Sequence, residues 1–246
     1  MSKREGLTPL KIAVTAVCTA FVCAATIVFS VYVPSTAGFF NIGESMVFLS
    51  ALLFGPFVGG FAGGFGSMLA DLLLGYPHYA PATLIIKAFE GYTVGFLKSK
   101  TPKFRSRLQW RFFTLILGLI AGSLLAAVGA IYYSGLMEIM IWYTPYSLSV
   151  PAWFWLVLGA IVALSAALTG FMVEPEFGWT VFSVMIGGFI MVFGYFIYQM
   201  FIIGWLFNIQ VIALVEVPIN IGQMMVGATV AIPASKIVWR AFPHLK

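Results

Sequence analysis

The chain has 246 residues, of which 61% are hydrophobic and only 9% are charged. A water-soluble globular domain carries about 25% charged residues, so this composition excludes an ordinary soluble protein and indicates one that spans a lipid bilayer. The formal net charge of +5 comes from short separate clusters, which does not indicate nucleic-acid binding. The two cysteines, Cys18 and Cys23, lie in one apolar run and predict neither a disulfide framework nor a metal site.

The first apolar stretch, residues 9–33, follows a short basic segment and must be distinguished from a secretory signal. It is longer than the signal core of about 7–15 residues, and no A-x-A-like cleavage site follows it before the next apolar run. We therefore predict that it is a membrane-spanning helix.

Further apolar runs follow along the whole chain. Two short ones meet at Gly55-Pro56, where the proline ring removes a backbone donor, so residues 43–75 are predicted to form a hairpin of two helices. A single helix there would extend about 50 Å, well beyond a hydrocarbon core of about 30 Å. The predicted spans lie near 9–33, 43–57, 58–75, 81–97, 111–134, 152–172, 179–207 and 212–238. The fold class is an all-α integral membrane protein, with residues 1–246 forming one membrane domain.

The distribution of basic residues predicts the orientation. Lys and Arg are enriched in cytoplasmic loops, so three cytoplasmic clusters require an even number of crossings between each cluster and the next. Four predicted spans separate each pair, which gives eight transmembrane helices with both termini cytoplasmic. Twelve of the 13 basic residues form these clusters: Lys3, Arg4 and Lys11; Lys98, Lys100, Lys103, Arg105, Arg107 and Arg111; and Lys236, Arg240 and Lys246.

The thirteenth basic residue, Lys87, lies inside the predicted span 81–97. A charge in the hydrocarbon costs at least about 2.5–3.5 kcal/mol, so such a group normally faces a protein interior, pairs with a partner or lines a path. Glu90 at i+3 and Thr83 at i−4 share its helix face, so Lys87 and Glu90 can pair on neighbouring turns. This pair predicts a binding site within the membrane.

Other polar side chains fall at similar predicted depth. Residues Glu216, Asn220 and Gln223 are spaced i, i+4, i+7 on one helix face, and Tyr195 and Gln199 are spaced i, i+4 on the preceding helix, with Tyr198 beside them. With Lys87 and Glu90 they gather in the outer half of the bilayer, which indicates one cavity that opens outward. Helix–helix hydrogen bonds, each worth about 0.6 kcal/mol, are the alternative explanation. Near the predicted helix ends, Glu44, Asp71 and Glu216 are equally well explained as solvated carboxylates.

Small residues indicate close helix packing in two places. Ala16, Ala20 and Ala24 recur every four residues along the first helix, forming a flat ridge whose partner is either internal or a separate subunit. A second series around Gly59 and Gly63 is predicted to pack internally.

Several motifs of enzymes and pumps are missing. The sequence contains no G-x-x-x-x-G-K-[ST] phosphate loop, so the chain cannot hydrolyse ATP by itself. It also lacks H-E-x-x-H and G-x-S-x-G, which weighs against a zinc protease or a serine hydrolase, and we predict no enzymatic activity, no catalytic residue, no cofactor and no metal. The two halves do not look duplicated, which weakens the case for an inverted-repeat transporter.

Several passages, in order, resemble the substrate-binding S component of energy-coupling factor (ECF) transporters, which import vitamins and related micronutrients into bacteria and archaea. The resemblance covers about 1–97 and 179–240. The passages are the alanine ridge of the first helix, FGP at 54–56, GGFGSMLADLL at 63–73, PATLIIKAFEG at 81–91, GGFIMVFGYF at 187–196, and EVPINIGQ at 216–223 before Gly227-Ala228.

The resemblance implies a six-helix core, with residues 111–172 as an inserted hairpin. It implies a vitamin-like substrate held in the outer half of the membrane under the loop 34–43, and docking of Ala16, Ala20 and Ala24 to a transmembrane coupling (T) subunit that works with two cytoplasmic ATPase subunits. The residues it places in the pocket are Asn41, Lys87, Glu90, Tyr195, Gln199, Asn220 and Gln223.

We therefore expect a multi-pass protein of a bacterial or archaeal cell membrane that binds a water-soluble vitamin or precursor, such as riboflavin or a thiamine-type pyrimidine. A self-sufficient cation- or proton-coupled transporter, with Lys87 and Glu90 as a relay, is the alternative. A membrane enzyme acting on a lipid is a weaker third interpretation, because no nucleophile and base are paired in the sequence.

Overall fold

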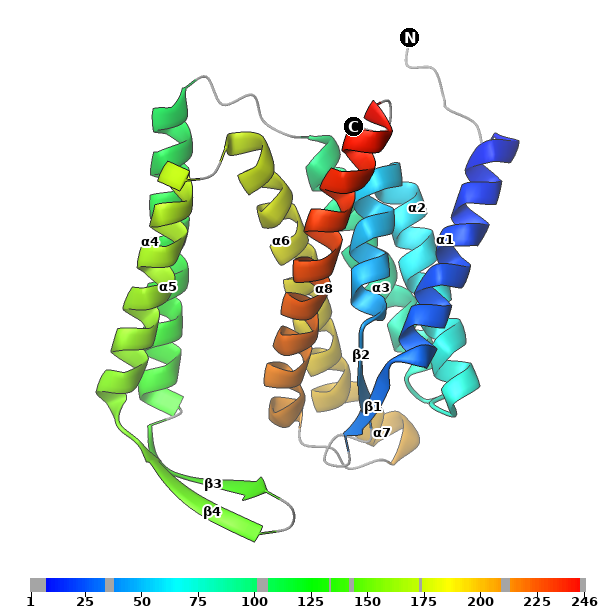
Figure 1. Cartoon of the computed structure of the whole chain (residues 1–246). Coiled ribbons are helices and arrows are strands. Elements are labelled where there is room, and N and C mark those ends of the chain that lie inside the picture. The colour runs from blue at the N-terminus through cyan, green and yellow to red at the C-terminus, as the bar shows by residue number, and fades with distance from the viewer. Residues whose placement is uncertain are drawn as a thin grey trace. The chain divides into compact units, whose positions relative to one another are not determined.

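The computed structural model describes residues 8–33, 38–100, 106–132, 134–141, 144–172, 174–208 and 213–243. The chain forms two compact units (Figure 1). Unit 1 comprises Met1–Thr101 and Trp179–Lys246, and unit 2 comprises Pro102–Gly178.

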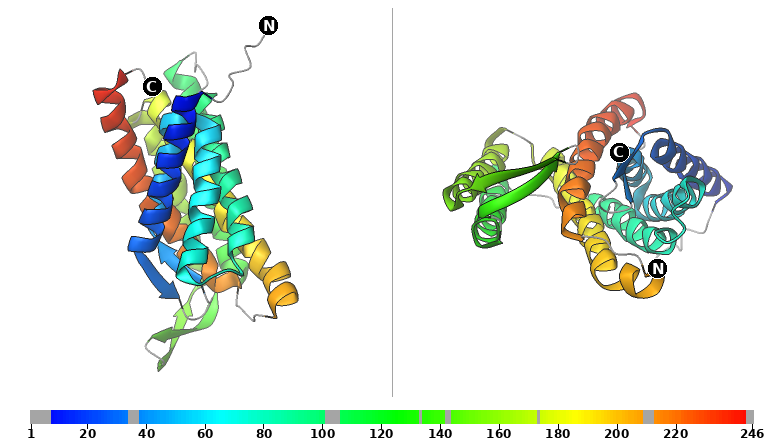
Figure 2. Two further views of the ribbon diagram at one scale, coloured as in Figure 1. Left: turned by 90° about the vertical axis from the view of Figure 1, so that its right-hand side faces the viewer. Right: turned by 90° about the horizontal axis from the view of Figure 1, so that it is seen from below.

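Unit 1 is a bundle of helices that run side by side along one direction (Figure 2, left). Helix α1 begins after Thr8, whose Oγ1 accepts a hydrogen bond from the backbone N–H of Lys11, with Pro9 at the first helical position. The elements of unit 1 are α1 (Pro9–Val28), β1 (Ser30–Val33), β2 (Gly38–Asn41), α2 (Gly43–Leu74), α3 (Ala80–Ser99), most of α6 (Pro175–Ile197), the π-helix η1 (Tyr198–Ile203), α7 (Gly204–Phe207) and α8 (Ala213–Ala241).

The first helix is shorter than predicted. It ends at Val28, and Ser30–Val33 pairs antiparallel with Gly38–Asn41, with Ser30 opposite Asn41. The prediction of a helix to residue 33 is therefore wrong for its last residues. The segment Ser-Val-Tyr-Val is rich in strand-forming residues, and an apolar run of this kind does not by itself distinguish helix from strand. Residues 34–37 of the predicted substrate loop lie outside the described residues.

Helix α2 is broken at Gly55, as Gly55-Pro56 predicted. The φ of Gly55 is 83°, a value that favours glycine. After the break the chain reverses its direction. A Cβ atom built on Gly59 would lie 2.5 Å from the Cβ of Ala51. In a straight helix, residues eight apart are about 12 Å apart. The two arms of α2 therefore lie antiparallel.

Among the residues that the structure describes, six helices are long and apolar enough to cross a membrane: Pro9–Val28, Gly43–Leu74, Arg107–Ala127, Ala152–Met172, Pro175–Phe207 and Glu216–Ala241. The chain is thus a predominantly helical, multi-pass membrane protein. Helix α2 is one of these six helices although it is broken at Gly55. Helix α3 is not among them, because its charged residues lower its mean hydropathy. The number of eight spans and the cytoplasmic location of both termini stay predictions. Within unit 1, the start of α1 and the end of α8 lie at the same end of the bundle (Figure 1).

Unit 2 contains α4 (Arg107–Tyr132), β3 (Gly135–Ile141), β4 (Thr144–Val150) and α5 (Ala152–Met172). The two helices pack antiparallel through small residues. A Cβ on Gly122 would lie 2.9 Å from the Cβ of Ala163, and one on Gly159 would lie 2.8 Å from the Cβ of Ala126. Strands β3 and β4 form an antiparallel ribbon between the helices, so the described chain contains two short β-ribbons in addition to its helices.

Candidate functional site

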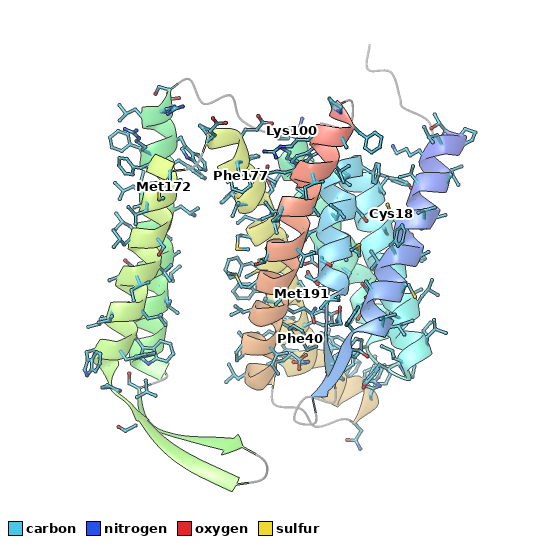
Figure 3. All side chains as sticks on the ribbon, viewed as in Figure 1. Cys18, Phe40, Lys100, Met172, Phe177 and Met191 are labelled. Carbon is cyan, nitrogen blue, oxygen red and sulfur yellow. The ribbon has the colours of Figure 1, made fainter. Side chains whose placement is uncertain are left out.

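A polar cavity of about 40 Å³ lies inside unit 1. It is found at the end of the bundle where β2 carries Phe40, and Lys100 marks the opposite end (Figure 3). Space of this size holds about three water molecules, since each needs roughly 10–15 Å³. The cavity is lined by residues from every long element of unit 1: Thr26, Phe39, Asn41, Ser67, Asp71, Tyr79, Thr83, Lys87, Tyr195, Glu216, Asn220 and Gln223.

Lys87 is at the centre of a buried charge cluster. It is 3% exposed, donates a hydrogen bond to Glu44, and its Nζ lies 3.0 Å from Oε2 of Glu90. Glu44 comes from the first arm of α2, whereas Lys87 and Glu90 lie on consecutive turns of α3. Because both carboxylates are buried, Lys87 is the cation that keeps them inside the bundle, and its loss would leave uncompensated buried charge.

The β1–β2 ribbon is tied to this cluster through α8. The backbone N–H and the side-chain Nδ2 of Asn41 both donate to Oε1 of Gln223, at 3.0 and 3.1 Å. Gln223 in turn donates from Nε2 to Oε2 of Glu44 at 3.3 Å. Asn41 Oδ1 accepts the backbone N–H of Gly43 at 2.9 Å, which fixes the start of α2. One amide on α8 thus connects the ribbon with the Lys87 cluster.

A second polar group lies where α6 changes into a π-helix. The hydroxyls of Thr83 and Tyr195 are 2.9 Å apart, and Gln199 Nε2 donates to the Tyr79 hydroxyl at 2.9 Å. Tyr198 donates to the backbone carbonyl of His78. Burial raises the pKa of the Tyr79 hydroxyl, so this group stays neutral while it accepts the hydrogen bond from Gln199. Single π-helical turns frequently occur at functional sites.

The structure brings most of the predicted site residues together. Asn41, Lys87, Tyr195, Asn220 and Gln223 line the cavity. Glu90 and Gln199 are not in its wall. They are buried one step behind it, where Glu90 pairs with Lys87 and Gln199 holds Tyr79.

Three carboxylates are buried, although their positions near predicted helix ends were equally compatible with solvated side chains. Glu44, Asp71 and Glu216 are 1%, 4% and 6% exposed, and the last two line the cavity. Glu216 lies on the same helix face as Asn220, so its burial could have been predicted from the spacing. Glu44 carries no such signal, because its contact with Lys87 depends on how α2 packs on α3. The predicted pairing of Lys87 with Glu90 is present, but Glu44 is a second partner that the sequence did not indicate.

The alanine ridge of the first helix faces away from the bundle. Ala16, Ala20 and Ala24 are exposed, whereas Cys18 and Val22 on the opposite face of α1 are buried against α2. The ridge therefore has no covering helix among the described residues.

These features define a class of protein: a multi-pass membrane protein with a polar chamber at one end of an apolar bundle. The family model of the ECF-type riboflavin transporter S component matches residues 6–151, more than half of the chain. The chain belongs to this family of vitamin-transporter S components. A protein from Pyrococcus woesei, described only as an uncharacterized protein in a gap 3' region, is 39% identical over 108 residues, which make up 44% of this chain and 67% of the relative.

The family match continues through α4 and the β3–β4 ribbon, beyond residue 97, where the first part of the sequence resemblance ends. The interpretation of residues 111–172 as an inserted hairpin therefore stays a prediction.

Proposed function

We propose that the chain is the substrate-binding subunit of an ATP-driven importer in the cell membrane of a bacterium or archaeon, and that it captures a water-soluble vitamin or precursor. Riboflavin and thiamine-type pyrimidines are the leading substrates. One observation carries the proposal: a buried lysine, held by two carboxylates from two helices, lies in the wall of a polar cavity. Ionisable groups within a membrane protein typically mark the path or binding site of a solute.

The energy for uptake comes from other subunits in this proposal. The sequence contains no phosphate loop of its own, so a transmembrane T subunit and two cytoplasmic ATPase subunits supply ATP hydrolysis. We assign the docking of the T subunit to Ala16, Ala20 and Ala24. Their exposure on α1 supports this assignment, because small residues let a second helix approach closely within a bilayer.

Substrate entry requires the cavity to widen. A space for about three water molecules is too small for a vitamin, and ligand pockets usually measure about 300–1,000 Å³. The β1–β2 ribbon is the element that can make room, because it contributes Phe39 and Asn41 to the wall and Asn41 is held to α8 through Gln223. We propose that these hydrogen bonds open when substrate enters and form again over it.

The purified chain provides a direct test. In lipid nanodiscs without partner subunits or an ion gradient, it should retain one vitamin-like molecule, which native mass spectrometry can detect. The Lys87→Ala variant should bind that molecule about tenfold more weakly or worse, because two carboxylates lose their cation. Lys100→Ala, at the opposite end of unit 1, is the matched control and should bind normally.

Two results would contradict this function. Normal affinity in a folded Lys87→Ala protein would remove Lys87 from the site. Gradient-driven uptake into liposomes that contain this chain alone would instead support a cation- or proton-coupled transporter.

A further inference from the structure

We propose that the cavity selects an organic cation, a heterocycle or amine whose positive group donates a hydrogen bond to Asp71. The inference rests on the proposed function, because it specifies the substrate of the same cavity. It follows from three separate features of the wall: its charge balance, an acceptor without a donor, and its aromatic rings.

The charge balance of the cavity is acidic. Asp71 and Glu216 line it together with Lys87, and Glu44 and Glu90 lie directly behind Lys87. Both ion pairs of Lys87 are made with Glu44 and Glu90, so its ammonium group is already engaged. Among the described residues, Asp71 therefore makes no ion pair with Lys87, and a buried carboxylate is stable only when a positive charge or a proton accompanies it.

Asp71 supplies the second observation. It is 4% exposed and lines the cavity, yet its Oδ2 atom has no hydrogen-bond partner among the described residues. An unsatisfied carboxylate oxygen in a membrane protein interior is costly, and such atoms in native structures usually have a ligand, water or ion as a partner. A ligand N–H with a positive charge would satisfy both the hydrogen bond and the charge of Asp71.

The aromatic rings of the wall also favour a cation. Phe39, Tyr79 and Tyr195 line the cavity, and the rings of Tyr79 and Tyr195 are 6.4 Å apart in an edge-on arrangement. The face of an aromatic ring attracts a cation, and aromatic walls are a recurring feature of sites for organic ammonium groups. Because rings and carboxylates occur in the same wall, an organic cation fits better than Ca²⁺ or Mg²⁺, which bind through oxygen ligands and gain nothing from aromatic rings.

The remaining ligand types fit less well. An anion would approach Asp71, and among the described residues of the lining the one cation is Lys87, which Glu44 and Glu90 already engage. A neutral solute could stack on the rings, but Asp71 would then have to be protonated to be stable at this depth. We therefore expect the charge of the ligand to decide affinity more than its shape.

The test uses the purified full chain in nanodiscs and an equimolar mixture of five compounds at neutral pH. Thiamine and pyridoxamine carry a positive charge, riboflavin and pyridoxine are neutral, and pantothenate is an anion. Pyridoxamine and pyridoxine form a matched pair, because an amine in one replaces a hydroxyl in the other. Compounds retained after washing are identified by mass spectrometry, and the affinity of each is then measured by calorimetry.

The proposal predicts that a cationic compound is retained and binds about tenfold or more tightly than the neutral compounds. Asp71→Asn preserves the shape of the side chain and removes its charge. It should weaken binding of the cation about tenfold and leave weak binding of neutral compounds nearly unchanged. Glu174→Gln in unit 2 is the matched control, which removes a carboxylate outside the cavity and should change neither value.

The outcomes separate this inference from the proposed function. Retention of riboflavin or pantothenate without either cation would overturn the charge selection and leave the binding function intact. Retention of none of the five compounds would count against both. An unchanged preference for cations in folded Asp71→Asn would overturn the role of Asp71. The ranking of compounds on the unmodified chain tests the charge selection even if Asp71→Asn does not fold.

Discussion

Unit 1 contains two stripes of small residues that the structure uses in opposite ways. On α1, Ala16, Ala20 and Ala24 recur every four residues and are exposed. On the second arm of α2, Gly59 and Gly63, with Gly60 and Gly64 beside them, are buried against α3 and the first arm. The same sequence spacing thus produces one covered surface and one open surface. The difference shows that spacing predicts close packing, whereas only the neighbouring elements decide what packs there.

The covered stripe, which is formed by Gly59, Gly60, Gly63 and Gly64, also positions the site. A Cβ atom on Gly63 would lie 2.8 Å from the backbone carbonyl oxygen of Lys87, so the absence of a side chain at Gly63 allows α3 to lie close enough for Lys87 to reach Glu44. The open stripe on α1 is separated from the cavity by the buried face of the same helix, which includes Cys18 and Val22. A substitution in one stripe should therefore affect folding and binding, and a substitution in the other should affect neither.

The largest effect is expected from Gly63→Leu. The added side chain collides with the backbone of α3, and overpacking of this kind costs about 1–3 kcal/mol or more. We expect loss of the single monodisperse peak in size-exclusion chromatography in detergent, or a marked fall in the thermal unfolding midpoint. Ala20→Leu adds comparable bulk to the open stripe and is the matched control. Similar losses in both variants would show that α1 is covered and that the two stripes do not differ.

The second effect concerns only the open stripe. Ala20→Trp should abolish uptake in cells that express the complete transporter, because the indole prevents close approach of the T subunit. Binding of ligand to the purified variant should remain normal, since Ala20 is exposed and does not line the cavity. Calorimetry and a radiolabelled uptake assay on the same variant measure the two properties separately. Loss of binding together with uptake would place the ridge inside the folded core instead.

Features that depend on one helix were predictable from the sequence. Helical spacing placed Thr83, Lys87 and Glu90 on one face, and all three are buried. It did the same for Glu216, Asn220 and Gln223, which the structure places in the cavity wall. The reason is physical: charged and amide groups within an apolar helix have to turn away from lipid, so a polar stripe defines the buried face.

Features that depend on contacts between elements were not predictable. Glu44 stands at the start of α2, and nothing in its surroundings along the chain indicates that it meets Lys87, 43 residues later. Hydropathy predicts Ser30–Val33 as the end of a helix although this segment is a strand, since hydropathy measures solvent preference rather than backbone geometry. The π-helix at Tyr198–Ile203 likewise has no pattern in the sequence that separates it from an α-helix, yet it begins at the residues that contact His78 and Tyr79.

The smallest effect is expected from a glycine that belongs to neither stripe. Gly222 lies in α8 between Asn220 and Gln223, and a Cβ atom built there meets nothing within 4 Å. Glycine inside a helix costs roughly 0.5–1 kcal/mol relative to alanine, so Gly222→Ala should raise the thermal unfolding midpoint by a few degrees. Ligand affinity should stay unchanged, because the two cavity residues beside it keep their helix face. Reduced affinity without reduced stability would show that ligand fills the open space beside Gly222. Gly222 would then be needed for ligand to bind, whereas Gly63 is needed for α2 and α3 to pack.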